Sequence, residues 1–244
     1  MDRPQKKIRI LSLQYHCYPD EVGGAWGLTY EINKRLVARG HKVYQITCKS
    51  VENQPSQEVI DGIQYHRISL RESKGMLLLW NAIRKKVKAI LNLESIHLIH
   101  IHNPLIGFLV LLQPSLWKVP KIYHFHSSWF DEERINAVGN AQISLGLKLR
   151  LEMIRIMEWV CYRFSRTLLF LSEYSKNRFK DYYSLSNPDL VIIPGGVDLN
   201  KFHPLKPEEN NNGIREKLNL QNNVPLILTV RRLEERMGLE NLIL

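Results

Sequence analysis

The sequence has 244 residues, 44% of them hydrophobic and 24% charged, a composition that excludes intrinsic disorder and predicts one or two globular domains. The apolar runs are shorter than the ~20 residues of a membrane-spanning helix, and the N-terminus lacks the apolar region of a secretory signal. Three cysteines without a CxxC pair argue against a disulfide framework and a zinc ribbon. We therefore expect a soluble, cytoplasmic protein.

Strands and helices alternate along most of the chain. Strands are predicted over residues 8–13, 43–48, 59–60, 63–68, 98–101, 121–125, 167–171 and 190–193. Helices are predicted up to Gly40 and over residues 76–91, 105–112, 147–164 and 173–183. This order predicts a Rossmann-like α/β fold, in which helices cover both faces of a mainly parallel sheet. Ligands of such sheets bind at the carboxyl ends of the strands.

The basic residues are concentrated in two segments. The formal net charge is +10, and Arg67–Leu91 holds seven basic residues against one acidic, while Ile143–Lys180 holds eight against three. Such segregation predicts an anionic partner, which could be phosphate, nucleic acid or acidic lipid. We expect the amphipathic helices over Met76–Leu91 and Leu147–Phe164 to contact the inner face of an acidic membrane or a lipid-linked acceptor. The alternative is that their apolar stripes only cover the sheet.

The second part of the chain has a different composition. Prolines and asparagines between Asp198 and Asn223 predict a linker, so we divide the chain into a first lobe, residues 1–205, and residues 206–244. The latter part contains a predicted strand over 225–230 and the start of a helix at Gly238. About 20 residues cannot build a core. We therefore interpret the second lobe as truncated or as completed by a separately encoded chain.

Gly23 and Gly24 lie between the first strand and the first helix. Glycines let the backbone approach a ligand, and a helix N-terminus presents free N–H groups to an anion. A structural turn would use the same residues. Their spacing does not match G-x-G-x-x-G, and Thr47-Cys48-Lys49 stands where a dinucleotide-binding protein has an acid, which argues against a nicotinamide-dependent dehydrogenase.

Five histidines fall close together in the sequence: His97, His100, His102, His124 and His126. Two His-x-His pairs at predicted strand ends place each pair on one face of the sheet. Such pairs could bind a metal, as in a metal-dependent hydrolase, but no carboxylate accompanies them in a metal-ligand pattern. We predict contact with a non-metal ligand, with a purely structural role as the alternative.

Arg231, Arg232 and Arg236 follow the strand predicted over residues 225–230. Arginines at a strand-to-helix junction can hold a diphosphate through charge-assisted hydrogen bonds, although an exposed run of charge would look the same. The excess positive charge would also suit a nucleic-acid-binding protein. No recognised nucleic-acid motif is present, and we expect no nucleic-acid partner.

Taken in order, several segments resemble the retaining GT-B glycosyltransferases of family 4. They are residues 8–11 leading into Gly23-Gly24-Ala25, then 39–43, 100–104, 123–126, 193–198 with Phe202 and Pro204, and 229–242. The resemblance implies a cytoplasmic hexosyltransferase that moves a sugar from a nucleotide diphosphate sugar to a glycan or lipid-linked acceptor. It also implies retention of anomeric configuration and neither a bound metal nor another cofactor.

The same resemblance implies roles for individual residues. Gly23 and Gly24 would border the cleft between two lobes, His126 would approach the donor sugar as the catalytic residue, and Arg231 would hold the donor diphosphate. The family often has a lysine where Met237 stands, which leaves Arg236 as the nearest replacement. The paired glutamates of the family lie farther along and are absent here. We therefore predict that these 244 residues alone do not transfer sugar.

Overall fold

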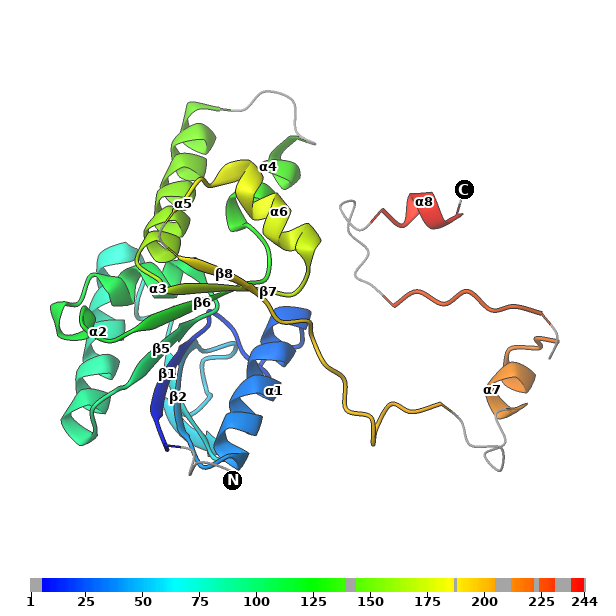
Figure 1. Cartoon of the computed structure of the whole chain (residues 1–244), viewed down its shortest axis with the longest axis horizontal. Helices are drawn as coiled ribbons and strands as arrows, with labels where there is room; N and C mark the ends of the chain where they lie inside the picture. Colours follow the sequence, from blue (N-terminus) through cyan, green and yellow to red (C-terminus); the bar gives the residue numbers. More distant parts are fainter. Residues whose placement is uncertain are drawn as a thin grey trace. The chain divides into compact units, whose positions relative to one another are not determined.

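The computed structural model describes residues 6–138, 144–186, 188–204, 212–221, 224–230 and 238–243 (Figure 1). The chain divides into two compact units, Met1–Gly195 and Gly196–Leu244. The first unit contains the β-sheet and most of the helices.

The first unit is built on an eight-stranded sheet with the order β3-β4-β2-β1-β5-β6-β7-β8. The strands are β1 (Arg9–Leu13), β2 (Lys42–Cys48), β3 (Gln57–Ile60), β4 (Ile63–Ile68), β5 (Leu98–Ile101), β6 (Lys121–Phe125), β7 (Thr167–Phe170) and β8 (Asp189–Ile192). All neighbours are parallel except β3 and β4, which form an antiparallel hairpin. The predicted Rossmann-like sheet is confirmed.

The hairpin turn has the backbone conformation expected of Asp-Gly. Asp61 and Gly62 have φ angles of 48° and 77°, in the left-handed region. A Cβ atom on Gly62 would lie 2.5 Å from Cγ1 of Val37. Glycine is therefore required there both by its backbone angle and by the close approach of the neighbouring helix.

The helices of the first unit are α1 (Gly24–Ala38), α2 (Met76–Leu93), α3 (Pro104–Leu111), α4 (Trp129–Val138), α5 (Leu145–Arg163) and α6 (Glu173–Tyr182), with a short 3-10 helix at Pro114–Leu116. Helix α1 lies on one side of the sheet and α2, α3 and α5 on the other (Figure 1). Sequence analysis missed α4, because its apolar residues do not recur with a helical period.

The two faces of the sheet differ in chemistry. The face under α2, α3 and α5 packs into the main core through apolar side chains from neighbouring strands, including Leu11, Ile99 and Leu168. On the α1 face, the register places Ser12 of β1 between Gln45 of β2 and His100 of β5. The α1 face is therefore apolar near the amino ends of the strands and polar toward their carboxyl ends.

A side chain of α1 bonds to this polar region. The amide nitrogen of Asn33 donates to Oγ of Ser12 at 3.0 Å and to Oε1 of Gln45 at 2.8 Å. All three side chains are buried. Buried polar groups are stable only with partners, so this network fixes the position of α1 over β1 and β2.

The second unit does not contain the predicted strand. Residues 224–230 form no strand, and their apolar side chains, such as Ile227 and Val230, are 81% and 87% exposed. A parallel strand needs hydrogen-bonded neighbours and cover on both faces, and the described residues of this unit provide neither. Two short helices are formed, α7 (Asn212–Lys217) and α8 (Glu240–Ile243). No helix among the described residues is long and apolar enough to span a membrane.

Candidate functional site

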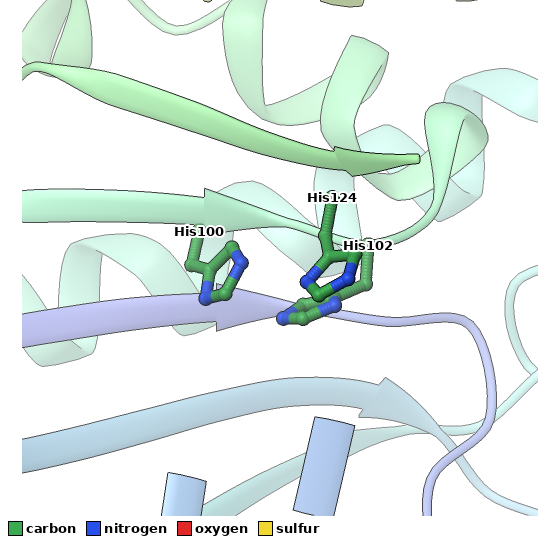
Figure 2. Close-up of side chains that lie close together, drawn as sticks. All are labelled: His100, His102 and His124. Carbon is green, nitrogen blue, oxygen red and sulfur yellow. The ribbon is translucent and has the colours of Figure 1, made fainter. Parts of the chain in front are cut away.

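Four histidines lie together where β5 and β6 end. His100 is in β5 and is paired with Ile122 of β6, so the side chains two residues farther along, His102 and His124, project from the same face. Figure 2 shows the rings of His100, His102 and His124 close together at the strand ends. His126 follows, with Nε2 3.1 Å from Nδ1 of His102, a hydrogen bond in which one ring donates.

Burial keeps these rings neutral. His100, His102 and His124 are each 4% exposed. Burial, reinforced by the neighbouring histidines, holds the pKa of His100 and His102 well below 6.5. Burial lowers the pKa of His124 to about 4. Burial and the neighbouring His124 together lower the pKa of His126 to about 3. At neutral pH each ring therefore offers one hydrogen-bond donor and one acceptor.

Several of these nitrogens have no partner within the described part of the chain. They are Nε2 of His100, Nε2 of His102 and both nitrogens of His124. The possible metal-ligand nitrogens of His100, His102 and His124 lie within 4.8 Å of one another. No other group of three His, Cys, Asp or Glu side chains in the described ranges could hold a metal ion. Unpartnered buried polar atoms are costly, so the cluster is suited to a ligand that supplies hydrogen bonds, or to a transition metal.

The two predicted glycines lie at the same edge of the sheet. Gly23 is the N-cap of α1, Gly24 is its first residue, and no side chain caps this end of the helix. Because β1 and β5 are parallel neighbours, the α1 N-terminus and the histidines follow the carboxyl ends of adjacent strands. A Cβ atom on Gly23 would lie 2.7 Å from Cε3 of Trp26, whereas Gly24 has open space around it. Only Gly23 is required by packing.

Buried groups of β4 hold the loop between β1 and α1. Arg67 is 2% exposed and forms a bidentate ion pair with Asp20, with Nε–Oδ2 and Nη2–Oδ1 distances of 2.5 and 2.8 Å. Its Nη1 atom donates to Glu58 at 2.8 Å. The hydroxyl of Tyr65 donates to the carbonyl oxygen of Tyr18 at 2.6 Å. These bonds fix the segment that leads to Gly23.

A buried carboxylate of α5 holds the loop that follows His126. Glu158 is 0% exposed. Its oxygens accept hydrogen bonds from the backbone N–H of Trp129 at 2.6 Å and from the hydroxyls of Ser128, Tyr162 and Tyr183 at 3.1, 3.1 and 2.5 Å. Burial raises the pKa of Glu158, against the opposite effect of these donors. Sequence analysis missed this residue, because in the sequence it is one of many charges on a basic helix.

One predicted histidine lies elsewhere, and two predicted arginines are not among the described residues. His97 is at the start of β5, where its Nδ1 accepts a hydrogen bond from the backbone N–H of Arg9 at 3.1 Å, so it is a structural histidine away from the cluster. Arg231 and Arg236 lie outside the described residues. Their contact with a diphosphate stays a prediction.

The two basic amphipathic helices differ in exposure. In α2 the predicted apolar stripe packs into the core through Leu79, Ile83, Val87 and Ile90, so it covers the sheet. In α5 a second apolar row is exposed in addition to the buried one, and it consists of Leu145, Leu149, Met153, Ile156 and Trp159. The alternative expected from the sequence, an apolar stripe that covers the sheet, is therefore seen in α2, while α5 has an exposed apolar row besides its buried one. Contact of these helices with a membrane or a lipid-linked acceptor stays a prediction.

Comparison with known proteins identifies a family. Residues 22–201 match the family described as Glycosyltransferase Family 4. Over 76 residues, 31% of this chain, the sequence is 36% identical to a GDP-mannose-dependent monoacylated alpha-(1-6)-phosphatidylinositol monomannoside mannosyltransferase from Corynebacterium glutamicum, of which the match covers 19%.

Solved structures show the same fold. Sucrose-phosphate synthase from Thermosynechococcus elongatus matches 97% of this chain with a TM-score of 0.70 and 20% identity. HepE of Anabaena, solved in complex with UDP and glucose, matches 87% with a TM-score of 0.55 and 16% identity. The chain spans 59% and 50% of the lengths of these two proteins.

Proposed function

This chain belongs to Glycosyltransferase Family 4, and from that premise we propose that it forms the acceptor-side lobe of a GT-B enzyme that transfers a hexosyl group from a nucleotide diphosphate sugar. In this reaction the bond between the anomeric carbon and the diphosphate oxygen breaks, and the nucleoside diphosphate leaves. The acceptor hydroxyl gives its proton to the departing diphosphate oxygen and bonds to the anomeric carbon on the same face, which retains the configuration. The enzyme needs no metal or other cofactor.

The histidine cluster is the observation that carries this proposal. His126 is neutral, its Nε2 is hydrogen-bonded to His102, and its ring stacks on those of His102 and His124, which carry the unpartnered nitrogens. A neutral ring nitrogen at the carboxyl end of a strand can exchange a hydrogen bond with a hydroxyl of the donor sugar. Gly23 and Gly24 border the same site, and Arg231 and Arg236 serve as the diphosphate ligands.

The named relatives support the choice of substrates. The Corynebacterium protein is named as a GDP-mannose-dependent transferase that acts on a phosphatidylinositol mannoside, and HepE has been solved with UDP-glucose. We therefore infer a nucleotide sugar as donor and a glycan or lipid-linked acceptor. We also propose that a separately encoded second lobe supplies further donor contacts, since the chain spans 59% and 50% of the lengths of sucrose-phosphate synthase and HepE.

Donor binding can be tested on this chain. Imidazole NMR spectra would be recorded during titration with UDP-glucose and GDP-mannose, because NMR detects binding even at millimolar affinity. We expect the signals of His126 and His102 to shift and those of His97 to stay. His126→Gln should abolish the effect, while His97→Gln, at the other end of β5, should keep it. Unchanged histidine signals at millimolar donor would contradict the proposal.

Retention is tested on the product. Where transfer is measured after a second lobe is supplied, proton NMR of the product reads the anomeric configuration directly. We expect the configuration of the donor, and an inverted product would refute the retaining mechanism. Stoichiometric zinc or iron in the purified protein would instead favour the metal-dependent hydrolase.

The exposed row of α5 supports a second part of the proposal, attachment to an acidic membrane surface on its cytoplasmic side. Leu145 and Leu149 are 73% and 60% exposed, and Lys148 and Arg155 flank the row along one side of the helix. Exposed apolar residues beside basic ones favour insertion among anionic headgroups, with about 1 kcal/mol for each basic residue near the surface.

Vesicle sedimentation tests this attachment. We expect binding to anionic vesicles that exceeds binding to neutral ones and that weakens when Leu149 and Ile156 are both changed to Gln. Leu93→Gln is the matched control, because Leu93 is 74% exposed at the end of α2, outside the row. Equal binding to neutral and anionic vesicles would exclude the attachment.

A further inference from the structure

A pocket of about 310 Å³ lies between α2 and the ends of β2 and β4. Its walls are rich in cationic groups and in neutral hydrogen-bonding groups. Lys49, Lys85 and Lys86 line the pocket and form no ion pair with the described residues, and the neutral polar side chains are those of Ser56, Ser69, Ser73 and Asn81. The pocket lies outside the histidine cluster, since the α2 side of the sheet is the opposite face.

The three lysines have no carboxylate partner in the described part of the chain. Nζ of Lys49 donates to the carbonyl oxygen of Glu52 at 2.9 Å, and Nζ of Lys86 donates to the carbonyl oxygen of Ser56 at 3.2 Å. Both bonds are to backbone groups and leave the charges unneutralised. Burial, together with the positive charge of Lys49, lowers the pKa of Lys86.

Most of the acidic residues nearby do not line the pocket. Glu72 is the one carboxylate that lines the pocket. The carboxylate of Glu52 accepts a hydrogen bond from the hydroxyl of Ser69. Arg67 also lines the pocket, and its guanidinium is already paired with Asp20 and Glu58. The side chains that line the pocket itself therefore include three lysines without an ion pair among the described residues and one carboxylate, that of Glu72.

We propose that this pocket binds a phosphate group, in the form of a phosphomonoester or phosphodiester. A phosphate accepts several hydrogen bonds at once, and the ammonium groups, the hydroxyls of Ser56 and Ser73 and the amide of Asn81 can all donate. The volume suits a small ligand or a headgroup, and a long nucleic acid would need an open basic groove instead. This proposal goes beyond sugar transfer and does not depend on it.

The phosphate could belong to a soluble ester or to a lipid. Leu78 lines the pocket and is 51% exposed, and Leu77 beside it is 68% exposed. These residues could contact an apolar part of the ligand at the mouth of the pocket. In both cases the pocket binds the same group, the phosphate.

Affinity measurements on the folded chain test the proposal. Inorganic phosphate and glycerol 3-phosphate would be titrated calorimetrically at constant ionic strength, with chloride as the reference anion. We expect phosphate binding that falls at least tenfold when Lys49 and Lys86 are both changed to Gln. Lys118→Gln is the control, because Lys118 is exposed and does not line the pocket. If the double variant does not fold, Lys85→Gln alone should still weaken binding, since Lys85 is exposed.

Vesicles distinguish the two sources of phosphate. Binding of the soluble esters that depends on these lysines assigns a soluble ligand. Binding confined to vesicles that contain phosphatidic acid, with the same dependence on the lysines, assigns a lipid headgroup. Phosphate binding that is matched by chloride, or that is equally strong in the double variant, would overturn the proposal. A failure here would leave the donor-binding result unaffected, because no nucleotide sugar is present.

Discussion

The two faces of the β-sheet carry opposite chemistry, although the same strands supply both. Under α2, α3 and α5 the side chains are apolar and fill a continuous core. On the α1 face, toward the carboxyl ends, the sheet carries Ser12, Gln45 and the histidine cluster, several of whose nitrogens have no partner among the described atoms. One face stabilises the fold, and the other keeps unsatisfied polar groups that a ligand could use. Proteins depart from optimal packing mainly at functional sites.

Lowering the pH should reveal the difference between the two faces of the sheet most strongly. The folded pKa values of the four clustered histidines are lowered, so the unfolded chain binds protons first as the pH falls. The contribution of neutral His124 to stability is fully present above pH 6.5 and is lost as the pH falls to 4, where His124 protonates in the folded state as well. For His124 alone the loss is about 3 kcal/mol.

Urea unfolding at pH 7, 6 and 5 measures this effect. We expect the free energy of unfolding to fall more steeply with pH in the wild type than in His124→Leu, by about 1.4 kcal/mol per pH unit, the contribution of one proton. The same slope in both proteins would show that His124 is not held neutral by burial.

A pair of neighbouring residues in β7 compares the two faces directly. Leu168 is fully buried in the main core, whereas Leu169 points to the α1 face and is only partly buried. Leu168→Ala should lower the free energy of unfolding by about 3 kcal/mol, because it leaves a cavity in close-packed surroundings. Leu169→Ala should cost about 1 kcal/mol. Equal losses would mean that the faces do not differ in packing.

The carboxylate of Glu158 should show how firmly the loop after His126 is held. In Glu158→Gln one acceptor oxygen becomes an NH₂ donor that faces hydroxyl and backbone donors, so we expect a loss of about 2 kcal/mol in unfolding free energy. The imidazole signals of His126 should also shift, because the loop begins directly after it. Glu152→Gln, on the exposed side of α5, is the control. Unchanged His126 signals would show that Glu158 has no influence on the histidine cluster.

Replacing His124, whose ring nitrogens have no partner among the described residues, should have the smallest effect on the free energy of unfolding and a clear effect on donor binding. His124→Leu replaces two buried nitrogens that lack hydrogen bonds by an apolar side chain of similar size. We expect the free energy of unfolding at pH 7 to rise by about 1 kcal/mol and the donor-induced shifts of His126 to decrease. A destabilised variant that keeps its donor response would identify His124 as a structural residue.

Much of the fold could be predicted from local pattern. The order of the strands and helices, the Asp61-Gly62 turn and the His-x-His pairs on one face all follow from periodicity and turn chemistry, which act over a few residues. Helix α4 could not be predicted in this way, because its start is fixed by Glu158, a residue far along the chain. The strand expected over residues 225–230 has the right composition, but strands form only when a neighbour supplies hydrogen bonds.

The Rossmann-like architecture and the family resemblance could be inferred from the amino-acid sequence. The packing of the folded chain was needed to show which apolar row is exposed, that His97 is apart from the other histidines, and that Glu158 supports the loop after His126. The physical reason is that local patterns record the preferences of neighbouring residues. Burial, pKa values and long-range hydrogen bonds depend instead on which distant segments pack together.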